Sequence, residues 1–539
     1  MDIDHDLSRI LWSNEVPDPI EATFIQREVD TVTGRISFLR AELEGLEDRL
    51  RRHRAALSPV RRVPLEILAE IFSNLFTDDL DFHSDDRDVV LQLGQVCRSW
   101  RQATLASHRL WAKVSVVYQE CNEASYEKIV TWLNRSGDLP KTFKFDHNDI
   151  DFCECELEDR DPEKPCQMSN AALVRLLSVG PKLHTLVLRC SSQVCFRTFL
   201  EKLGPEPDLM NPRPWDTLHS LELELTTADS CPWDEPLEAS KSLFYHLPQV
   251  TSLNLHIPPT WVAFEWDPSS TRTVALNVPP RLLHGIKVLT LHCEWQGSHI
   301  LSMLQHCENL ETLEIDFRGE ALQYDQDDAL VHKFIASRLL LSKLHTICLR
   351  SATNIEILNF LRAPSLQDLR FDMHYGYQDP QEVDFQEPLL RFTKASNCQE
   401  TLRSLHLRKL VVSAVKLART LLELPSLTGI TLDRCRFEEN LFWRQMKYFA
   451  VRSRRGGDDP LCLPHLQELQ TLCIPVEGSW LASVAKFLKA NREINPLPCS
   501  WKVSYRTVMR AELGVRRELA DLRHDGVSFH VLPSESFWD

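Results

Sequence analysis

The first pattern of apolar positions is a heptad series in the N-terminal part of the chain. Between Ile25 and Leu57 these positions recur at alternate steps of three and four residues, the spacing of a coiled-coil seam. The series consists of Val29, Val32, Ile36, Leu39, Leu43, Leu46, Leu50, His53 and Leu57. It predicts a helix over residues 21–58, after a flexible N-terminus over residues 1–20. Two arrangements would bury this apolar seam: a coiled-coil homodimer, or packing of the helix against the rest of its own chain.

A second apolar pattern follows directly. Leu65, Leu68 and Phe72 fall at helical spacing on one face, whereas Ile67 and Ile71 lie on another face of the same helix. A helix that is apolar on several sides is normally buried on several sides. The segment is too short to build a large core of its own. The pattern therefore predicts that a partner protein covers the second face.

The same residues resemble a known family. Residues 63–72 read VPLEILAEIF, residues 96–101 read VCRSWR, and Leu110 and Trp111 follow. In order and spacing they resemble the F-box, a three-helix unit that docks on the Skp adaptor of Skp–cullin–F-box ubiquitin ligases. The acidic run over residues 77–88 departs from the family by lengthening the loop between the first two helices. A piece of ordinary helical core is the alternative interpretation.

The resemblance implies an F-box-like domain over residues 59–115 and a set of residues that would bind the adaptor. The start of the motif would form the first helix, Val96, Cys97 and Trp100 would lie in the last helix, and Trp111 would close the unit. The implied adaptor-binding residues are Pro64, Leu65, Glu66, Ile67, Leu68, Ile71, Phe72, Val96, Cys97, Trp100 and Trp111. A linker with an acidic loop would follow over residues 116–168.

A leucine repeat dominates the remainder of the chain. Ten segments carry leucine-x-x-leucine-x-leucine or a close relative, and their middle positions are 22 to 42 residues apart. They are Leu183-Leu186-Leu188, Leu218-Leu221-Leu223, Val250-Leu253-Leu255, Ile286-Leu289-Leu291, Leu310-Leu313-Ile315, Leu344-Ile347-Leu349, Leu366-Leu369-Phe371, Leu402-Leu405-Leu407, Leu427-Ile430-Leu432 and Leu469-Leu472-Ile474. The shorter steps fit leucine-rich repeats, and the longer ones imply insertions. The repeat predicts a solenoid over residues 169–500 with a curved parallel sheet on one face.

The repeat is degenerate. Only Cys435 stands where leucine-rich repeats usually carry asparagine or cysteine after the last leucine. A leucine-rich helix–sheet protein without true repeats is the alternative. After the solenoid, a helix over residues 505–523 is predicted to cap the last repeat, within a C-terminal segment over residues 501–539.

The outward positions of the predicted strands change from acidic to basic along the solenoid. Leucines point into the core of such a strand, and the residues between them point outward. The outward candidates for binding a target are Glu222, Glu224, Glu314, Asp316, Arg350, Arg370, His406 and Arg408. Arginine is the strongest candidate among them because it makes bidentate contacts with carboxylate or phosphate groups. Simple solvated strand positions are the alternative reading of these charges.

Composition limits the partners and excludes several classes of function. A net charge of −16 argues against nucleic acid as the main partner. The acidic N-terminus differs from a signal peptide, and no apolar run is long enough to span a bilayer. We therefore expect a chain in the cytoplasm, the nucleus or both. No phosphate-binding loop, serine elbow or paired zinc-binding histidines are found, so neither an enzyme nor a cofactor is expected.

Cysteines near an acidic segment raise the question of a metal. His147, Cys153, Cys155 and Cys166 could ligate zinc, but their spacing is not that of the usual ligand pairs. A solvated acidic loop is the preferred interpretation, and Cys190 and Cys195 are expected to be packed thiols rather than a redox pair. No metal site is predicted.

Together these patterns predict an α/β chain with a coiled-coil helix, a three-helix F-box-like unit and a leucine-rich-repeat solenoid with a curved parallel sheet. The resemblance to fungal-type F-box proteins with degenerate leucine-rich repeats implies a substrate receptor of a Skp–cullin–F-box ubiquitin ligase. Its partners would be the Skp adaptor, through it a cullin, and a target protein. A non-catalytic interaction scaffold without a role in ubiquitin transfer is the alternative.

Overall fold

A computed structural model provides the structure of the chain and divides it into two compact units. The first unit comprises Met1–Thr77 and Val89–Ser107, and the second comprises Asp78–Asp88 and His108–Asp539. The structure describes residues 8, 10–12, 16–75, 84–118, 121–146, 153, 166–204, 212–225, 241–257, 277–292, 297–317, 329–374, 382–454, 461–473, 480–495, 497–504, 522 and 527–532. Among these residues, no helix combines the length and the apolar character needed to cross a membrane.

The first unit is helical. Its described elements are α2 (Pro19–Ala56), η1 (Pro59–Arg62), α3 (Leu65–Ser73), the part of α4 (Ser84–Val96) from Val89 onward, and α5 (Arg98–Ala106). The heptad series therefore forms one long helix, close to the predicted bounds. Asp18 begins it, because its carboxylate accepts hydrogen bonds from the backbone N–H of Ile20 and Glu21 at 2.8 Å each. The Glu21 carboxylate accepts in return from the Asp18 N–H at 3.0 Å, which completes a capping box.

The described residues of the second unit form one parallel sheet of 14 strands whose order in space is their order in the sequence. The strands are β1 (Lys113–Val117), β2 (Thr142–Asp146), β3 (Thr185–Cys190), β4 (Ser220–Leu225), β5 (Ser252–His256), β6 (Val288–His292), β7 (Thr312–Asp316), β9 (Thr346–Ala352), β11 (Asp368–Met373), β12 (Ser404–Arg408), β13 (Gly429–Asp433), β14 (Glu468–Leu472), β15 (Cys499–Ser504) and β16 (Val527–Leu532). A separate pair joins β8 (Leu339–Leu340) and β10 (Leu361–Arg362). Sequential parallel pairing of this kind is typical of a solenoid.

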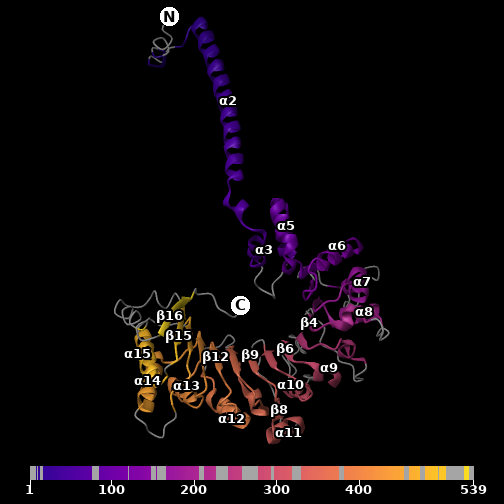
Figure 1. Ribbon diagram of the computed structural model, residues 1–539, viewed down its shortest axis with the longest axis vertical. Coiled ribbons are helices and arrows are strands. Elements are labelled where there is room, and N and C mark those ends of the chain that lie inside the picture. The colour runs from indigo at the N-terminus through magenta and orange to yellow at the C-terminus, as the bar shows by residue number, and fades with distance from the viewer. Residues whose placement is uncertain are drawn as a thin grey trace. The chain divides into compact units, whose positions relative to one another are not determined.

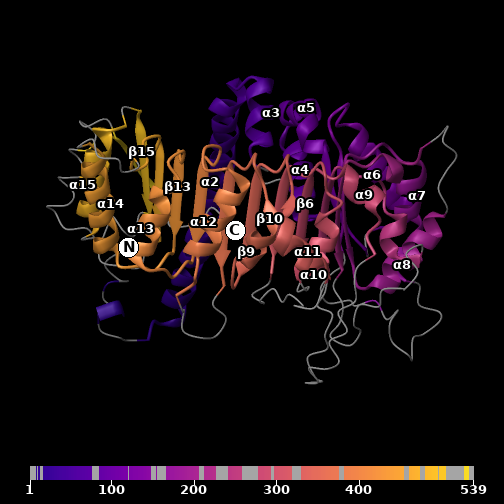
Figure 2. The same cartoon turned by 90° about the horizontal axis from the view of Figure 1, so that it is seen from below.

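Helices connect the strands and cover one face of this sheet (Figures 1 and 2). The α-helices are α6 (Glu123–Asn134), α7 (Ala171–Val179), α8 (Gln193–Leu203), α9 (Pro280–Gly285), α10 (Gly297–Leu304), α11 (Ala329–Ser337), α12 (Gln386–Ser396), α13 (Ala414–Leu422), α14 (Glu439–Arg454) and α15 (Leu481–Arg492). The 3-10 helices are η2 (His108–Trp111), η5 (Gln167–Ser169), η6 (Pro214–Thr217), η8 (Leu243–His246) and η9 (Glu356–Phe360). One face of the sheet is thus covered by helices and the other carries the outward strand residues.

The first nine leucine segments lie in register and fill the core between sheet and helices. Leu186 pairs with Leu221, Leu221 with Leu253, and the alignment continues strand by strand to Ile430 of β13. The middle residues of these segments are at most 2% exposed. The local leucine pattern was therefore sufficient to find these strands.

The tenth segment was misplaced by three residues. Leu469 of β14 pairs with Ile430 and Thr471 pairs with Leu432, so the segment reads Leu466-Leu469-Thr471. Thr471 is fully buried, and its hydroxyl accepts a hydrogen bond from the Trp501 indole N–H at 2.9 Å. The correct alignment was missed because a threonine, Thr471, occupies a leucine position. The spacing of Leu469 and Leu472 also fits the pattern, so the segment was placed three residues too late.

The sheet also continues beyond the leucine repeats at both ends. Phe143 of β2, inside the segment predicted as a linker, pairs with Leu186, and Val114 of β1, at the end of the predicted F-box-like domain, pairs with Phe143. At the other end Trp501 of β15 and Phe529 of β16 take the same positions. These strands escaped the sequence pattern because other apolar residues replace leucine. The predicted cap helix over residues 505–523 lies almost entirely outside the described residues.

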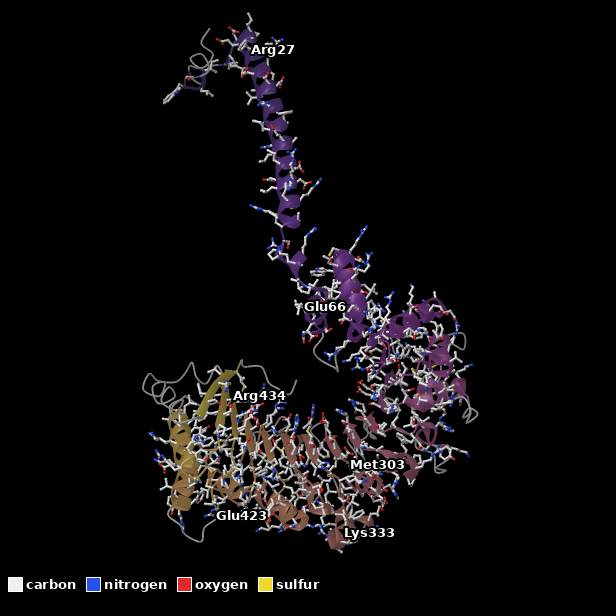
Figure 3. All side chains as sticks on the ribbon, viewed as in Figure 1. Arg27, Glu66, Met303, Lys333, Glu423 and Arg434 are labelled. Carbon is white, nitrogen blue, oxygen red and sulfur yellow. The ribbon has the colours of Figure 1, made fainter. Side chains whose placement is uncertain are left out.

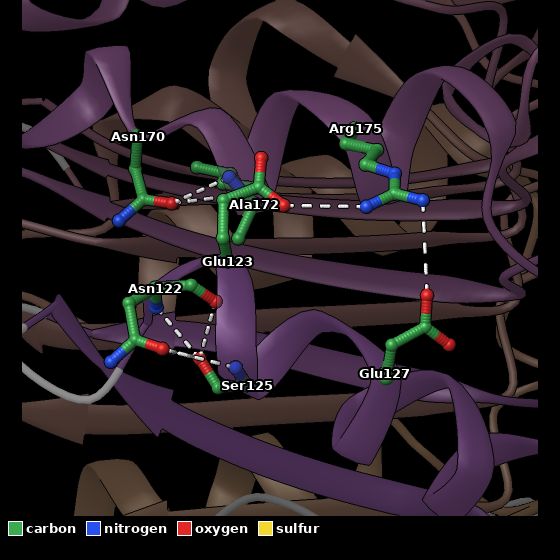
Figure 4. Close-up of polar contacts among 8 residues, drawn as sticks. Asn122, Glu123, Ser125, Glu127, Asn170, Ala172 and Arg175 are labelled. Atoms are coloured by element: carbon green, nitrogen blue, oxygen red, sulfur yellow. Dashed lines mark hydrogen bonds and ion pairs between the residues drawn. The ribbon is translucent and has the colours of Figure 1, made fainter.

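Polar side chains fix the start of the helices at the N-terminal end of this unit (Figure 4). Asn122 caps α6 by accepting from the Ser125 N–H at 3.0 Å, and Asn170 caps α7 by accepting from the Ala172 N–H at 3.0 Å. Arg175 of α7 binds Glu123 of α6 at 3.3 Å and Glu127 at 3.8 Å. These contacts hold α6 and α7 side by side next to β1–β3.

Candidate protein-interaction surfaces

Helix α3 has an inner face that holds the first unit together. Leu68 and Phe72 are 4% and 2% exposed. The Phe72 ring packs on Trp100 of α5 with ring centroids 4.9 Å apart, and the hydroxyls of Ser73 and Ser107 are 2.7 Å apart. The Arg101 guanidinium of α5 donates to the Gly94 carbonyl of α4 at 3.0 Å, which joins the remaining helix.

The opposite side of α3, with the α4–α5 junction, exposes apolar side chains. We call Leu65, Ile67, Ile71, Val96 and Cys97 the docking face, since all five are exposed. Ile67 and Ile71 are 53% and 49% exposed, although isoleucine is normally buried. Several exposed apolar residues on one small unit mark an interaction surface rather than a core. The two faces predicted from the helical spacing are therefore present, but Leu65, which was predicted to share the face of Leu68 and Phe72, is exposed at the start of α3.

Some of the implied adaptor-binding residues occupy other places. Pro64 and Glu66 are exposed beside the docking face, but Leu68 and Phe72 point inward. Trp100 is half-buried against Phe72. These inward residues support the docking face without forming it.

The placement of Val96, Cys97 and Trp111 differs from the expectation. Val96 ends α4 and Cys97 is the N-cap of α5, so only Trp100 of that group lies within the last helix. Trp111 is buried in the second unit, where its ring contacts Trp132 at 4.6 Å and lies under the Arg135 guanidinium. The reason is that η2 runs directly into β1, the first strand of the sheet.

The outward face of the sheet is the second candidate surface. Every predicted target-binding residue lies there, on β4, β7, β9, β11 or β12, at the positions that alternate with the buried leucines. In register, Glu224 lies beside Arg189, Asp316 beside Arg350, and Arg370 beside His406. The alternation expected for these strands is confirmed on β4 and β7, whereas the outward residues Cys348 of β9, Asp372 of β11 and Arg408 of β12 are buried.

Neighbouring strands neutralise much of the charge on this face. Arg189 of β3 binds Asp146 at 3.1 Å and Glu224 at 2.6 Å, so its guanidinium offsets the negative charge of these two carboxylates. His292 lies 3.6 Å from Asp316, and its ring stacks on His256 with centroids 3.6 Å apart. The predicted change from acidic to basic is therefore weaker in space than it is along the sequence.

Arg408 is a structural residue of this face. It is 6% exposed and lies between two buried carboxylates, 3.2 Å from Asp372 and 3.4 Å from Asp433. Burial raises the pKa of Asp433, and the Arg408 charge opposes that rise. Since its charge is already committed inside the protein, Arg408 does not serve as an accessible recognition residue.

Arg350 and Arg370 keep a partly exposed guanidinium on the same face. Arg350 binds Glu314 of the neighbouring strand at 2.7 Å, and Arg370 binds Asp368 of its own strand at 2.5 Å. His406 lies next to them, 3.6 Å from Asp368, and burial lowers its pKa. Arg350 and Arg370 therefore place partly exposed positive charge on this part of the sheet face.

Comparison with known families identifies one part of the chain. Residues 60–116 match the F-box-like family model, which spans η1 to β1 and includes the docking face. The chain therefore contains an F-box-like domain at these residues, and F-box domains generally bind Skp-type adaptors. A comparison with curated proteins gives no match for the chain.

Proposed function

We propose that this chain is the substrate-recognition subunit of a Skp–cullin–F-box ubiquitin ligase. The observation that carries the proposal is the docking face: Ile67 and Ile71 are exposed on α3, within the residues that match the F-box-like family. A Skp-type adaptor would cover this apolar face and connect the chain to a cullin. Burying several such side chains is a typical source of affinity in protein interfaces.

The second unit would hold the target protein. Its sequential parallel strands and nine in-phase leucine segments support a leucine-rich-repeat solenoid, whose sheet face would present Glu222, Glu224, Glu314, Asp316, Arg350, Arg370 and His406. Repeat proteins of this architecture use such extended surfaces for binding. Arg350 and Arg370 would contact carboxylates or phosphates of the target.

On this proposal the chain performs no covalent chemistry and needs no cofactor. It would bring a target lysine close to a ubiquitin-conjugating enzyme bound elsewhere on the ligase, so that its contribution is proximity and orientation. It would act in the cytoplasm, the nucleus or both, where cullin-based ligases assemble.

Co-elution of the purified full-length chain with a Skp-type adaptor, with and without a cullin, tests the proposal. We expect one complex containing chain, adaptor and cullin on a sizing column. Binding of the adaptor without recruitment of the cullin would instead support an interaction scaffold outside ubiquitin transfer. Failure to bind the adaptor at micromolar concentrations would overturn the proposal.

A further inference from the structure

Three cysteines from different segments meet next to η5 and α8. The Sγ atoms of Cys153, Cys166 and Cys195 all lie within 4.8 Å of one another, and those of Cys153 and Cys166 are 3.9 Å apart. Cys195 is a packed thiol as predicted, since it is fully buried, and the fold also brings it to the two other cysteines. Of the remaining ligands considered from the sequence, His147 and Cys155 lie outside the described residues.

Main-chain contacts position each cysteine. Cys195 lies in the first turn of α8, where its N–H donates to the hydroxyl of the N-cap Ser192 at 3.3 Å. The Cys153 N–H donates to the Ser191 hydroxyl at 3.4 Å, just before the same helix. Cys166 is the N-cap residue of η5 and is buried, as is Cys195. The hydroxyls of two consecutive serines therefore hold the main chain of Cys153 and of Cys195 at the start of α8.

The sulfur spacing fits thiolates around one cation. Tetrahedral zinc with Zn–S bonds of about 2.3 Å places its sulfur ligands about 3.8 Å apart. The observed 3.9 Å between Cys153 and Cys166 matches that spacing, whereas a disulfide bond needs about 2.05 Å. One divalent cation with three thiolates carries one net negative charge, which suits a position at the N-terminal end of α8.

We propose that Cys153, Cys166 and Cys195 bind a thiophilic divalent cation, with Zn²⁺ as the natural occupant. Hydrogen bonding to Cys153 and Cys166, together with burial, raises the pKa of Cys195. A bound cation deprotonates its thiol ligands, so binding would release protons and link Cys153 to η5 and α8.

Metal content of the full-length chain tests this site. After purification and dialysis, we expect about one zinc ion per chain by elemental mass spectrometry, and a thiolate-to-cobalt absorption band after replacement by Co²⁺. Cys153→Ser should reduce bound zinc at least tenfold and abolish the band. Cys473→Ser is the matched control, because Cys473 is a half-buried cysteine outside the cluster, and it should bind zinc normally.

Three results would overturn the metal site. The first is a wild-type chain that neither retains zinc nor gives the cobalt band. The second is a Cys153→Ser variant that keeps its zinc, and the third is a Cys473→Ser variant that loses as much zinc as Cys153→Ser. Circular dichroism of both variants separates loss of the ligand from loss of the fold. The outcome is independent of adaptor binding, since the cluster lies in the second unit.

A different observation concerns α2, whose apolar seam is exposed. The helix has 38 residues and buries none of them. From Val29 to Leu50 the seam residues are 44–56% exposed, and side chains project from the helix on all sides (Figure 3). A heptad seam of this length is stable when a second helix covers it. The charges beside the seam show which pairing suits it.

A parallel pair of α2 helices is disfavoured by these charges. Val29, Ile36, Leu43 and Leu50 occupy the first position of successive heptads. In a parallel pair, the residue just before each of these positions faces the residue that is five places further along the other helix. Arg35 would then face Arg40, Glu42 would face Glu47, and Arg49 would face Arg54 of the second copy. All three pairs are like-charged, and each occurs twice by symmetry.

An antiparallel pair satisfies the same charges. We centre the two helices between Ser37 and Phe38, which is also the midpoint of Pro19–Ala56. The flanking residues that precede the first heptad positions then meet one another, so that Glu28 faces Arg49 and Arg35 faces Glu42 of the second copy. Each of these opposite-charge pairs occurs twice.

The apolar residues match in the same alignment. Ile36 packs with Leu39, Val32 with Leu43, Val29 with Leu46 and Ile25 with Leu50 of the second copy. Shifting the alignment by one heptad would place Glu42 against Glu42, or Arg35 against Arg35, of the second copy, and both pairs are like-charged.

We infer that α2 forms an antiparallel coiled coil with a second copy of this chain. The helix is about 57 Å long at 1.5 Å per residue, so the two ends that lead into the F-box-like domains would be separated by roughly that distance. Such a dimer would present two sheet faces to one multivalent target and increase avidity.

One substitution separates the two orientations by the sign of its effect. Arg35→Glu places Glu against Glu42 in the antiparallel pair, and we expect dimerisation of the full-length chain to weaken roughly tenfold. In the parallel pair the same change removes the clash with Arg40, and the dimer would tighten. Arg27→Glu is the control, because Arg27 lies on the outer side of α2 and should leave the dimer unchanged.

Sedimentation equilibrium over a range of concentrations measures these effects. A monomeric wild-type chain at all concentrations would overturn the inference and favour packing of α2 on its own chain. Tighter dimerisation of Arg35→Glu would overturn the antiparallel orientation, and equal weakening by Arg27→Glu would show that the seam charges do not decide it.

Discussion

Replacing Ile71 by aspartate is expected to lower the affinity of the chain for a Skp-type adaptor at least 100-fold while the chain keeps its fold. Ile71 is 49% exposed on α3, so the free chain tolerates a carboxylate there. In the complex the carboxylate would be buried in an apolar interface without a partner. A 100-fold loss corresponds to about 2.8 kcal/mol, which is within the range for a central interface residue.

Isothermal titration calorimetry with the purified adaptor measures this loss. Ile335→Asp is the matched control, since Ile335 is an isoleucine of α11 in the second unit and is 61% exposed. Its affinity should equal that of the unmodified chain. Equal binding by Ile71→Asp, or equal loss in both variants, would contradict the proposed docking face. Leu68→Asp is unsuitable because Leu68 is buried, and a charge there would disrupt the first unit itself.

Replacing Arg408 by alanine is expected to destabilise the second unit by about 3–5 kcal/mol, the usual effect of breaking a buried ion pair. The guanidinium is the counter-ion of Asp372 and Asp433, both buried. Without it, the carboxylates of Asp372 on β11 and Asp433 on β13, the two strands that flank β12, remain, and only Asp372 keeps a lysine, Lys409, at 3.3 Å. The arginine stem is also lost from the packed face.

The pH dependence of the Arg408→Ala variant follows from the same contacts. Burial already raises the pKa of Asp433, and removing Arg408 raises it further. The folded variant then binds a proton that the unfolded chain releases, so its stability increases as the pH falls towards the folded pKa. We expect the deficit relative to the unmodified chain to shrink between pH 7 and pH 5.

Denaturant unfolding followed by tryptophan fluorescence at several pH values measures both effects. Arg370→Ala provides the comparison, because Arg370 is paired with Asp368 but partly exposed, and its loss should cost less than about 1 kcal/mol. A deficit below 1 kcal/mol for Arg408→Ala, or one that grows as the pH falls, would contradict the structural role of Arg408.

Local periodicity explains what could be predicted about the fold. Side chains repeat every 3.6 residues in a helix and every two in a strand, so the two faces of α3 and nine leucine strands could be recognised from short windows of sequence. The same windows failed where another residue type fills the core position. The register of β14 was misassigned because Thr471 takes a leucine position. The first two strands of the sheet were missed because Val114 and Phe143 take the corresponding positions there.

By itself, the sequence determined the long N-terminal helix, the F-box-like motif and the in-phase leucine segments, because each depends on residues that are close together in the chain. Only the tertiary structure decided which charges are accessible and which cysteines meet. Arg408 is paired with Asp372, 36 residues away, because β11 and β12 are neighbours in the sheet. Cys153 meets Cys195 for the same physical reason: packing brings together residues whose separation in the sequence carries no periodic signal.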